Sequence, residues 1–268
     1  MAISLYDAHN HLQDERLVPH WADIWPVLER ESIVRMVVNG SSESDWGKVD
    51  QIAREHPRVV PSFGYHPWYV SQRSGQWQKS LRNFLDRRPA VIGEIGLDRW
   101  IEGFDLPQQE EVFVWQWLLA AERRLPVTVH CLKAWGPLLK LIASLPALSH
   151  GFLLHSYRGP AEMIPALTKL GAYFSISGYF AHDRKGKQRE AFRQVPADRL
   201  LIETDAPDMS LPSERIQYPL ADSKSEAINH PGNLRAVYEF VAELLEEPVA
   251  SLAVRVERNF QRLFNLPS

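Results

Sequence analysis

Short apolar runs alternate with amphipathic segments along the whole chain. Runs rich in Val, Ile, Leu and Phe, each bounded by polar residues, Gly or Pro, predict strands near residues 3–8, 33–39, 58–63, 90–95, 126–130, 151–155, 172–176 and 199–204. Between and after them, apolar residues recur at helical spacing in the segments 21–30, 108–124, 138–145, 161–170, 188–193, 232–246 and 248–262. Such alternation of strands and helices is typical of a parallel sheet flanked by helices.

The number of these β/α repeats predicts a closed barrel. Eight predicted strands in a chain of 268 residues agree with the roughly 250 residues of a (β/α)8 TIM barrel. No shift in composition indicates a linker, so we expect a single domain spanning residues 1–268. The exception to the regular pattern is the segment 208–229, which is rich in Pro, Ser and charge. Loops of this length are usually functional or disordered, and we expect this irregular segment to border the site.

Polar side chains stand where several of these strands end. Imidazoles and carboxylates together are the ligands of hydrolytic divalent metal centres, and a barrel builds its active site at the C-terminal ends of its strands. The sequence therefore predicts a two-metal site formed by His9, His11, Glu94, His130, His155 and Asp205.

The period of a strand assigns supporting roles to their neighbours. Alternate residues share a face, so Asp7 points the same way as His9 and lies one layer deeper. That depth predicts that Asp7 accepts a hydrogen bond that fixes a histidine tautomer. By the same reasoning Glu203 is predicted to support Asp205 from below. Glu94 lies in an apolar strand, where an unpaired carboxylate is costly, and two cations sharing it would remove that cost.

The order of the motifs resembles that of TatD-type metal-dependent deoxyribonucleases, a family of amidohydrolase-like barrels. The matching motifs cover nearly the whole chain: DAHNH at 7–11, GYHP at 64–67, IGEIGLD at 92–98, PVTVH at 126–130, SG at 177–178 and ETDAP at 203–207. The resemblance implies a TIM barrel, one or two divalent ions and hydrolysis of phosphodiesters. It matches His9, His11 and Asp205 to one metal, His130 and His155 to the other, and Glu94 to the bridge between them. It also implies a substrate-side or supporting role for His66.

The chain departs from the family pattern on the substrate side. Leu132 and Asp183 stand where relatives often carry Arg and Lys, and His230 stands where a Glu is common. The basic run at 184–189 fits two interpretations equally: a solvated face, or phosphate contacts through Arg184, Lys185 and Lys187. Trp68, Trp100 and Trp135 lie in or near loops of the expected mouth, where base stacking competes with ordinary packing as their role.

Composition limits the choice of partners. Hydrophobic residues make up 45% of the chain and charged residues 24%, with a net charge of −3 and a pI of about 6.4. No global basic field attracts nucleic acid, so phosphate contacts must be local. The single cysteine, Cys131, excludes an intramolecular disulfide and is expected to pack behind the site, because neighbours on a strand face opposite ways. We find no export signal and no apolar run for a membrane, expect a cytoplasmic protein, and infer no obligate protein partner.

The ligand set predicts a metal-dependent hydrolase that uses a metal-activated water. The resemblance implies that its substrate is DNA, and we expect cleavage at single strands or frayed ends. Asp205 would orient the water and accept its proton, and Glu94 would bridge the cations. One alternative is a small-molecule amidohydrolase or esterase on the same two-metal barrel, although many of these use a modified lysine as the bridge. Another is a non-catalytic nucleic-acid-binding barrel, which has no need of six convergent ligands. The ligand set fits Zn²⁺, Mn²⁺ or Mg²⁺.

Overall fold

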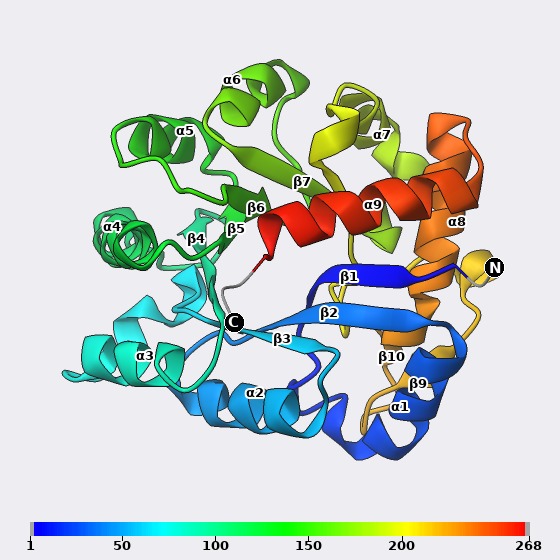
Figure 1. Cartoon of the computed structure of the whole chain (residues 1–268), viewed down its shortest axis with the longest axis horizontal. Coiled ribbons are helices and arrows are strands. Elements are labelled where there is room, and N and C mark those ends of the chain that lie inside the picture. Colours follow the sequence, from blue (N-terminus) through cyan, green and yellow to red (C-terminus); the bar gives the residue numbers. More distant parts are fainter. Residues whose placement is uncertain (1–2, 266–268) are drawn as a thin grey trace.

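The strands form one parallel sheet that curls into a nearly closed barrel (Figure 1). The computed structural model describes residues 3–265 of the chain. Each strand pairs with the next along the chain, in the order β1 to β8. The strands are β1 (Leu5–Asn10), β2 (Ile33–Asn39), β3 (Val59–Phe63), β4 (Val91–Asp98), β5 (Val127–Leu132), β6 (Phe152–Leu154), β7 (Ala172–Ile176) and β8 (Leu200–Ile202). This confirms the predicted (β/α)8 TIM barrel.

Helices surround the barrel and cover its outer face (Figure 1). Their apolar stripes pack on strands that are buried on both sides, the arrangement that a parallel sheet requires. They are α1 (Trp21–Arg30), α2 (Glu43–Glu55), α3 (Trp77–Leu85), α4 (Leu106–Arg123), α5 (Trp135–Ala143), α6 (Ile164–Lys169), α7 (Gly186–Phe192), α8 (Leu234–Leu245) and α9 (Val249–Leu263). The apolar pattern of the sequence does not predict α2 and α3, because each presents only a sparse stripe of large apolar residues in a polar sequence.

The barrel closes between β1 and β8 through a few specific bonds at the mouth. The Asp205 amide donates to the His9 carbonyl at 2.9 Å, and the His11 amide donates to the Ala206 carbonyl at 2.8 Å. Below them the Asp7 carboxylate accepts from the Thr204 amide at 2.9 Å and from its hydroxyl at 2.6 Å. The seam therefore holds the residues after β8 directly beside the His9–His11 pair.

The segment 208–229 is more ordered than its composition predicts. It contains an antiparallel hairpin formed by β9 (Pro219–Ala221) and β10 (Ala227–Asn229). The Asn229 amide donates to the Pro207 carbonyl at 2.8 Å, and its side chain donates to the Thr204 carbonyl at 2.8 Å. The expectation of a wholly irregular segment is wrong because these contacts with the end of β8 hold the hairpin in place. Within residues 3–265, no helix is both long and apolar enough to cross a membrane.

Candidate metal centre

One group of potential ligand atoms lies between β1, β4 and the end of β8. The Nε2 atoms of His9 and His11 are 3.2 Å apart. Oε2 of Glu94 lies 3.3 Å from the first and 3.4 Å from the second. Oδ1 of Asp205 lies 3.6 Å from both. Two imidazole nitrogens and two carboxylate oxygens thus converge on one point.

A second group lies beside the first and uses the other oxygen of the same glutamate. Oε1 of Glu94 is 2.8 Å from Nε2 of His155 and 3.1 Å from Nδ1 of His130. These two nitrogens are 3.2 Å apart. The structure therefore brings together all six residues that the sequence singles out, and Glu94 belongs to both groups.

A bulge in β4 places Glu94 between the two groups. The pairing of β4 with β5 shifts by one residue between Ile92 and Ile95, and bulges of this kind re-aim side chains next to active sites. The Glu94 amide leaves the ladder and donates to the Gly40 carbonyl at 3.0 Å. Glu94 consequently lies in the middle of β4, not at its end as the sequence predicts, because the strand continues to Asp98.

The donor set fits divalent cations. Ligands held tetrahedrally at roughly 2.0–2.1 Å from a zinc ion are about 3.3 Å from one another, close to most of the separations in both groups. Oε1 of Glu94 is buried without a hydrogen-bond partner in the described residues, and a buried unpaired carboxylate oxygen is costly. A cation in each group would remove that cost. It would also offset the repulsion between imidazole nitrogens whose lone pairs face each other.

Hydrogen bonds set the tautomers of two histidines so that a bare nitrogen faces the centre. Nδ1 of His11 is 2.8 Å from the Asn39 carbonyl, which can only accept, so Nε2 of His11 carries the lone pair. Nε2 of His130 is 2.8 Å from Oδ2 of Asp98, which leaves its Nδ1 bare. Partners of this kind orient the ligands of metal centres.

Asp98 contacts the candidate centre, although the sequence does not predict a role for it. It ends β4, and its carboxylate also accepts from the indole of Trp68 at 2.7 Å and the amide of Trp100 at 2.6 Å. Burial would raise the pKa of Asp98, but the hydrogen bond and charge of His130, together with the bonds from Trp100 and Trp68, lower that pKa to about 2. Its place at the end of an apolar strand, four residues after Glu94, is the signal that could have identified it.

The prediction that Asp7 fixes a histidine tautomer is wrong. Its carboxylate accepts from Thr204, from the Asn10 side chain at 3.1 Å and from the His9 backbone amide at 3.3 Å. These bonds hold backbone segments of β1 and the end of β8, and none involves an imidazole. Burial raises the pKa of Asp7 to about 7.

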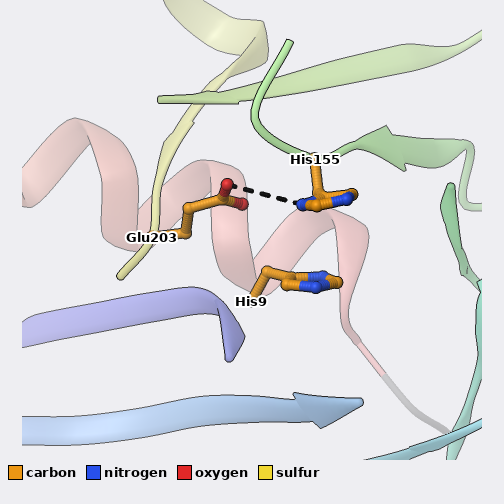
Figure 2. A group of neighbouring side chains, drawn as sticks. All are labelled: His9, His155 and Glu203. Atoms are coloured by element: carbon orange, nitrogen blue, oxygen red, sulfur yellow. Dashed lines mark ion pairs between the residues drawn. The ribbon is translucent and has the colours of Figure 1, made fainter. Parts of the chain in front are cut away.

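Glu203 supports His155 from the interior side of the barrel, whereas the sequence places it under Asp205. Figure 2 shows the rings of His9 and His155 lying parallel, with the Glu203 carboxylate facing His155. Oε1 of Glu203 is 3.6 Å from Nδ1 of His155 and accepts from the Ser156 hydroxyl at 2.5 Å. The Ser175 hydroxyl donates to its other oxygen. Glu203 thus carries a negative charge behind His155, with Nε2 of that ring facing Glu94.

The ionisable side chains of the centre shift one another's pKa values. Burial by itself would raise the pKa of Glu94, but His155 and the neighbouring imidazoles hold that pKa well below its usual value. Burial would lower the pKa of His11, yet Glu94 and Asp205 raise it to about 9. Burial raises the pKa of Asp205, and the Glu203 carboxylate adds to the effect. Cations would take the place of protons in balancing these carboxylates, so metal binding should release protons.

His66 faces the centre as a hydrogen-bond donor. Its Nδ1 accepts from the Trp68 amide at 3.2 Å, so the proton of the neutral ring resides on Nε2. Nε2 lies 3.5 Å from Oε1 of Glu94, and burial holds the pKa of His66 well below its usual value. A nitrogen that carries a proton is a poor metal ligand, but it can donate to a substrate oxygen.

Three cations gather around Tyr179 on the β6–β8 side of the mouth. Its ring centre is 4.4 Å from the Lys185 ammonium, 5.2 Å from the Arg184 guanidinium and 5.4 Å from that of Arg158. None of the three forms an ion pair within residues 3–265. The sequence predicts Arg184 and Lys185 here but not Arg158, which lies in the loop after His155. Lys187 is exposed on α7 and does not contact the ring.

The other residues that the sequence singles out near the mouth pack in the core or hold the backbone. Trp135 is partly buried and packs edge-on against Tyr157, with ring centres 4.7 Å apart, so it belongs to the packing of α5. Cys131 is buried in the apolar core, as expected, and burial raises the pKa of its thiol. Asn229 and His230 hold backbone near the end of β8 and in the turn that follows it.

Comparison with known proteins gives consistent matches over the whole barrel. Residues 6–265 match the family described as TatD related DNase. The chain is 34% identical to the 3'-5' ssDNA/RNA exonuclease TatD of Erwinia tasmaniensis, over 86% of this chain and 88% of that protein. It is 28% identical to the uncharacterized metal-dependent hydrolase YabD of Bacillus subtilis, over 98% and 99%. The crystal structure of YJJV, a TatD homolog from Escherichia coli, has the same fold, with a TM-score of 0.89 at 24% identity and full coverage of both chains.

Proposed function

Because the chain belongs to the family of TatD related DNases, we propose that this metal-dependent hydrolase cleaves phosphodiester bonds in single-stranded or frayed DNA. The observation that carries the proposal is the position of Glu94. Each of its oxygens faces a separate group of imidazole nitrogens, at 2.8–3.1 Å in one and 3.3–3.4 Å in the other. Such a shared carboxylate suits two cations that act on one phosphate.

The ligands of the two cations follow from the two groups. His9, His11 and Asp205 would hold one cation, His130 and His155 the other, and Glu94 both. When bound, divalent cations lower the pKa of water and neutralise charge that develops on a phosphate. Imidazoles favour Zn²⁺, while the carboxylates also admit Mn²⁺ or Mg²⁺.

The side chains of the mouth would perform the remaining steps. The side chain of Asp205 is 11% exposed, and its carboxylate can orient a water molecule and accept its proton. His66 would donate its Nε2 proton in a hydrogen bond to a phosphate oxygen. Arg158, Arg184 and Lys185 would hold a neighbouring phosphate, because they converge on Tyr179 without carboxylate partners.

The test of the reaction is a substrate comparison with the metal-loaded enzyme. We expect cleavage of single-stranded oligonucleotides, slower cleavage of blunt duplexes, and no comparable turnover of small esters and amides, because an unpaired strand end enters a barrel mouth more easily than a duplex. Single-stranded RNA belongs in the same series. Equal rates on single strands and duplexes would contradict a pocket-like site. Turnover of esters or amides alone would replace the nuclease with a small-molecule hydrolase.

The test of the shared carboxylate is Glu94→Ala. We expect its metal content, measured by elemental analysis after dialysis, to fall to one ion or fewer per chain, and turnover to be abolished. Circular dichroism checks that the barrel persists. Two ions per chain in the variant would show that Glu94 does not hold the cations together.

A further inference from the structure

The exposed aromatic side chains of this protein are concentrated at one place. Within the described residues, six large apolar side chains are more than a third exposed, and the aromatic ones are Trp68 at 45%, Trp100 at 63% and Phe104 at 39%. All three lie in the loops that follow β3 and β4, at the mouth of the barrel. We call these three residues the aromatic rim.

Two residues of the aromatic rim, Trp68 and Trp100, are attached to the candidate metal centre through one carboxylate. Oδ2 of Asp98 accepts from the Trp68 indole at 2.7 Å, and Oδ1 accepts from the Trp100 amide at 2.6 Å. The same carboxylate bonds His130 at 2.8 Å. The ring centres of Trp68 and His130 are 6.4 Å apart. The Trp68 ring therefore lies directly beside a histidine of the candidate centre.

Positive charge accompanies the rings. The Lys133 ammonium lies 3.8 Å from the centre of the Trp100 ring, and the Arg99 guanidinium lies 5.7 Å from that of Phe104. Neither cation forms an ion pair in the described part of the chain. Exposed flat rings next to free cations are how proteins bind unpaired nucleotides, with the base on the ring and the phosphate beside the cation.

We propose that the aromatic rim stacks a base of the substrate strand beside the cleaved phosphate, so that unpaired bases are recognised by contact. This inference rests on the proposed nuclease function and adds the residues that contact a base of the substrate. The rim lies on the β3–β5 side of the centre, whereas the cations around Tyr179 lie on the β6–β8 side. A strand across the mouth would have bases on one side and a phosphate held on the other. In a duplex the faces of the bases are covered, so the rim would also contribute to the preference for single strands.

The test compares intact oligonucleotides with matched strands in which one nucleotide at a time lacks its base. With the metal-loaded enzyme, we expect kcat/KM to fall by about tenfold when the stacked base is missing. Trp100→Ala should lower kcat/KM by a similar factor on the intact strand and leave the corresponding abasic strand nearly unchanged. Trp68→Phe loses the indole bond to Asp98 and can lower the rate on both strands, but it should keep most of the discrimination between them, because it keeps a ring. Leu118→Ala, which removes a 44% exposed apolar side chain on α4, is the control and should change neither substrate.

With an active enzyme, either of two results would overturn the proposal. One is an equal loss on intact and abasic strands in Trp100→Ala, which would make the residue merely structural. The other is a wild-type dimer in sedimentation that Trp100→Ala dissolves, which would assign the rim to a second copy of the chain. If the enzyme cleaves neither strand, the proposed function fails. Binding by the aromatic rim is then tested by tryptophan fluorescence, which the intact strand should quench and the abasic strand should not. Quenching that is absent, or equal with the abasic strand, excludes stacking there.

Discussion

Asp98 determines which nitrogen of His130 faces the centre. The acceptor at 2.8 Å from Nε2 holds the proton there and leaves Nδ1 bare toward Glu94. His11 is oriented by a backbone carbonyl instead, at 2.8 Å from its Nδ1. The orientation of His130 thus depends on a titratable side chain, whereas that of His11 depends on the main chain. Of these two supports, only that of His130 can be altered by a single conservative substitution.

We expect Asp98→Asn to weaken metal affinity or activity by about 10–100-fold, the usual cost of losing a charged partner behind a ligand histidine. The measurement is activity as a function of added metal, because a loss confined to metal affinity is rescued at high metal. Asp105→Asn is the matched control. Asp105 caps α4 by accepting from the Gln108 amide at 3.0 Å, and this variant should keep wild-type activity. An Asp98→Asn enzyme with unchanged metal affinity and turnover would remove Asp98 from the centre.

At the scale of elements, the junction of β4 and β5 positions both Glu94 and His130. Gly96 permits the two strands to approach, since a Cβ added there would lie 2.0 Å from the His130 carbonyl oxygen. The bulge that turns Glu94 inward lies immediately before it. The positions of Glu94 and His130 therefore both depend on the absence of a side chain at Gly96.

Gly96→Ala should destabilise the protein by about 1–3 kcal/mol or more, because the added methyl group forces the strands apart, and it should lower metal content through His130. Denaturation of the chelated protein measures the first effect without the contribution of bound metal. Gly47→Ala is the opposite case, since Gly47 lies within α2 with no atom near an added Cβ. That variant should gain up to about 1 kcal/mol from helix propensity. Equal stability of the two variants would contradict this account of the junction.

At the scale of the molecule, the net charge is negative but the charge at one side of the mouth is positive. The chain carries a net charge of −3, yet Arg158, Arg184 and Lys185 gather without carboxylate partners at the mouth. Attraction of a nucleic-acid strand must therefore come from a few local contacts, which differs from the broad positive surface of a groove-binding protein.

The dependence of kcat/KM on salt should accordingly be shallow. Each phosphate contact contributes roughly −0.7 to the log–log slope for single strands, so these three cations give a slope of about −2. Arg158→Gln should reduce it by about 0.7. Arg124→Gln is the control of equal charge change, because Arg124 lies at the end of α4 and at the opposite face of the barrel, and it should leave the slope unchanged. A slope near −10, or an unchanged slope in Arg158→Gln, would contradict the phosphate contacts.

The sequence by itself determined the barrel and the residues of its centre. Alternating strands and helices leave few other arrangements for a chain of this length, and parallel strands bring their C-terminal ends to one edge. His9, His130, His155 and Asp205 could therefore be grouped without coordinates, because each stands in or just after a strand whose direction and face are set by its apolar neighbours.

Only the tertiary structure decided how these side chains are supported. Asp7 and Asp98 lie in strands and Glu203 directly follows one, and the period of a strand cannot tell which of them bonds an imidazole. That choice depends on the bulge in β4 and on contacts between segments far apart in sequence, such as Asp7 with Thr204 and Asp98 with Trp68. The sequence does not predict the place of Arg158 for the same reason, since its neighbours Tyr179 and Met209 come from other loops. Periodicity reports which face a side chain occupies, whereas its partners are set by packing.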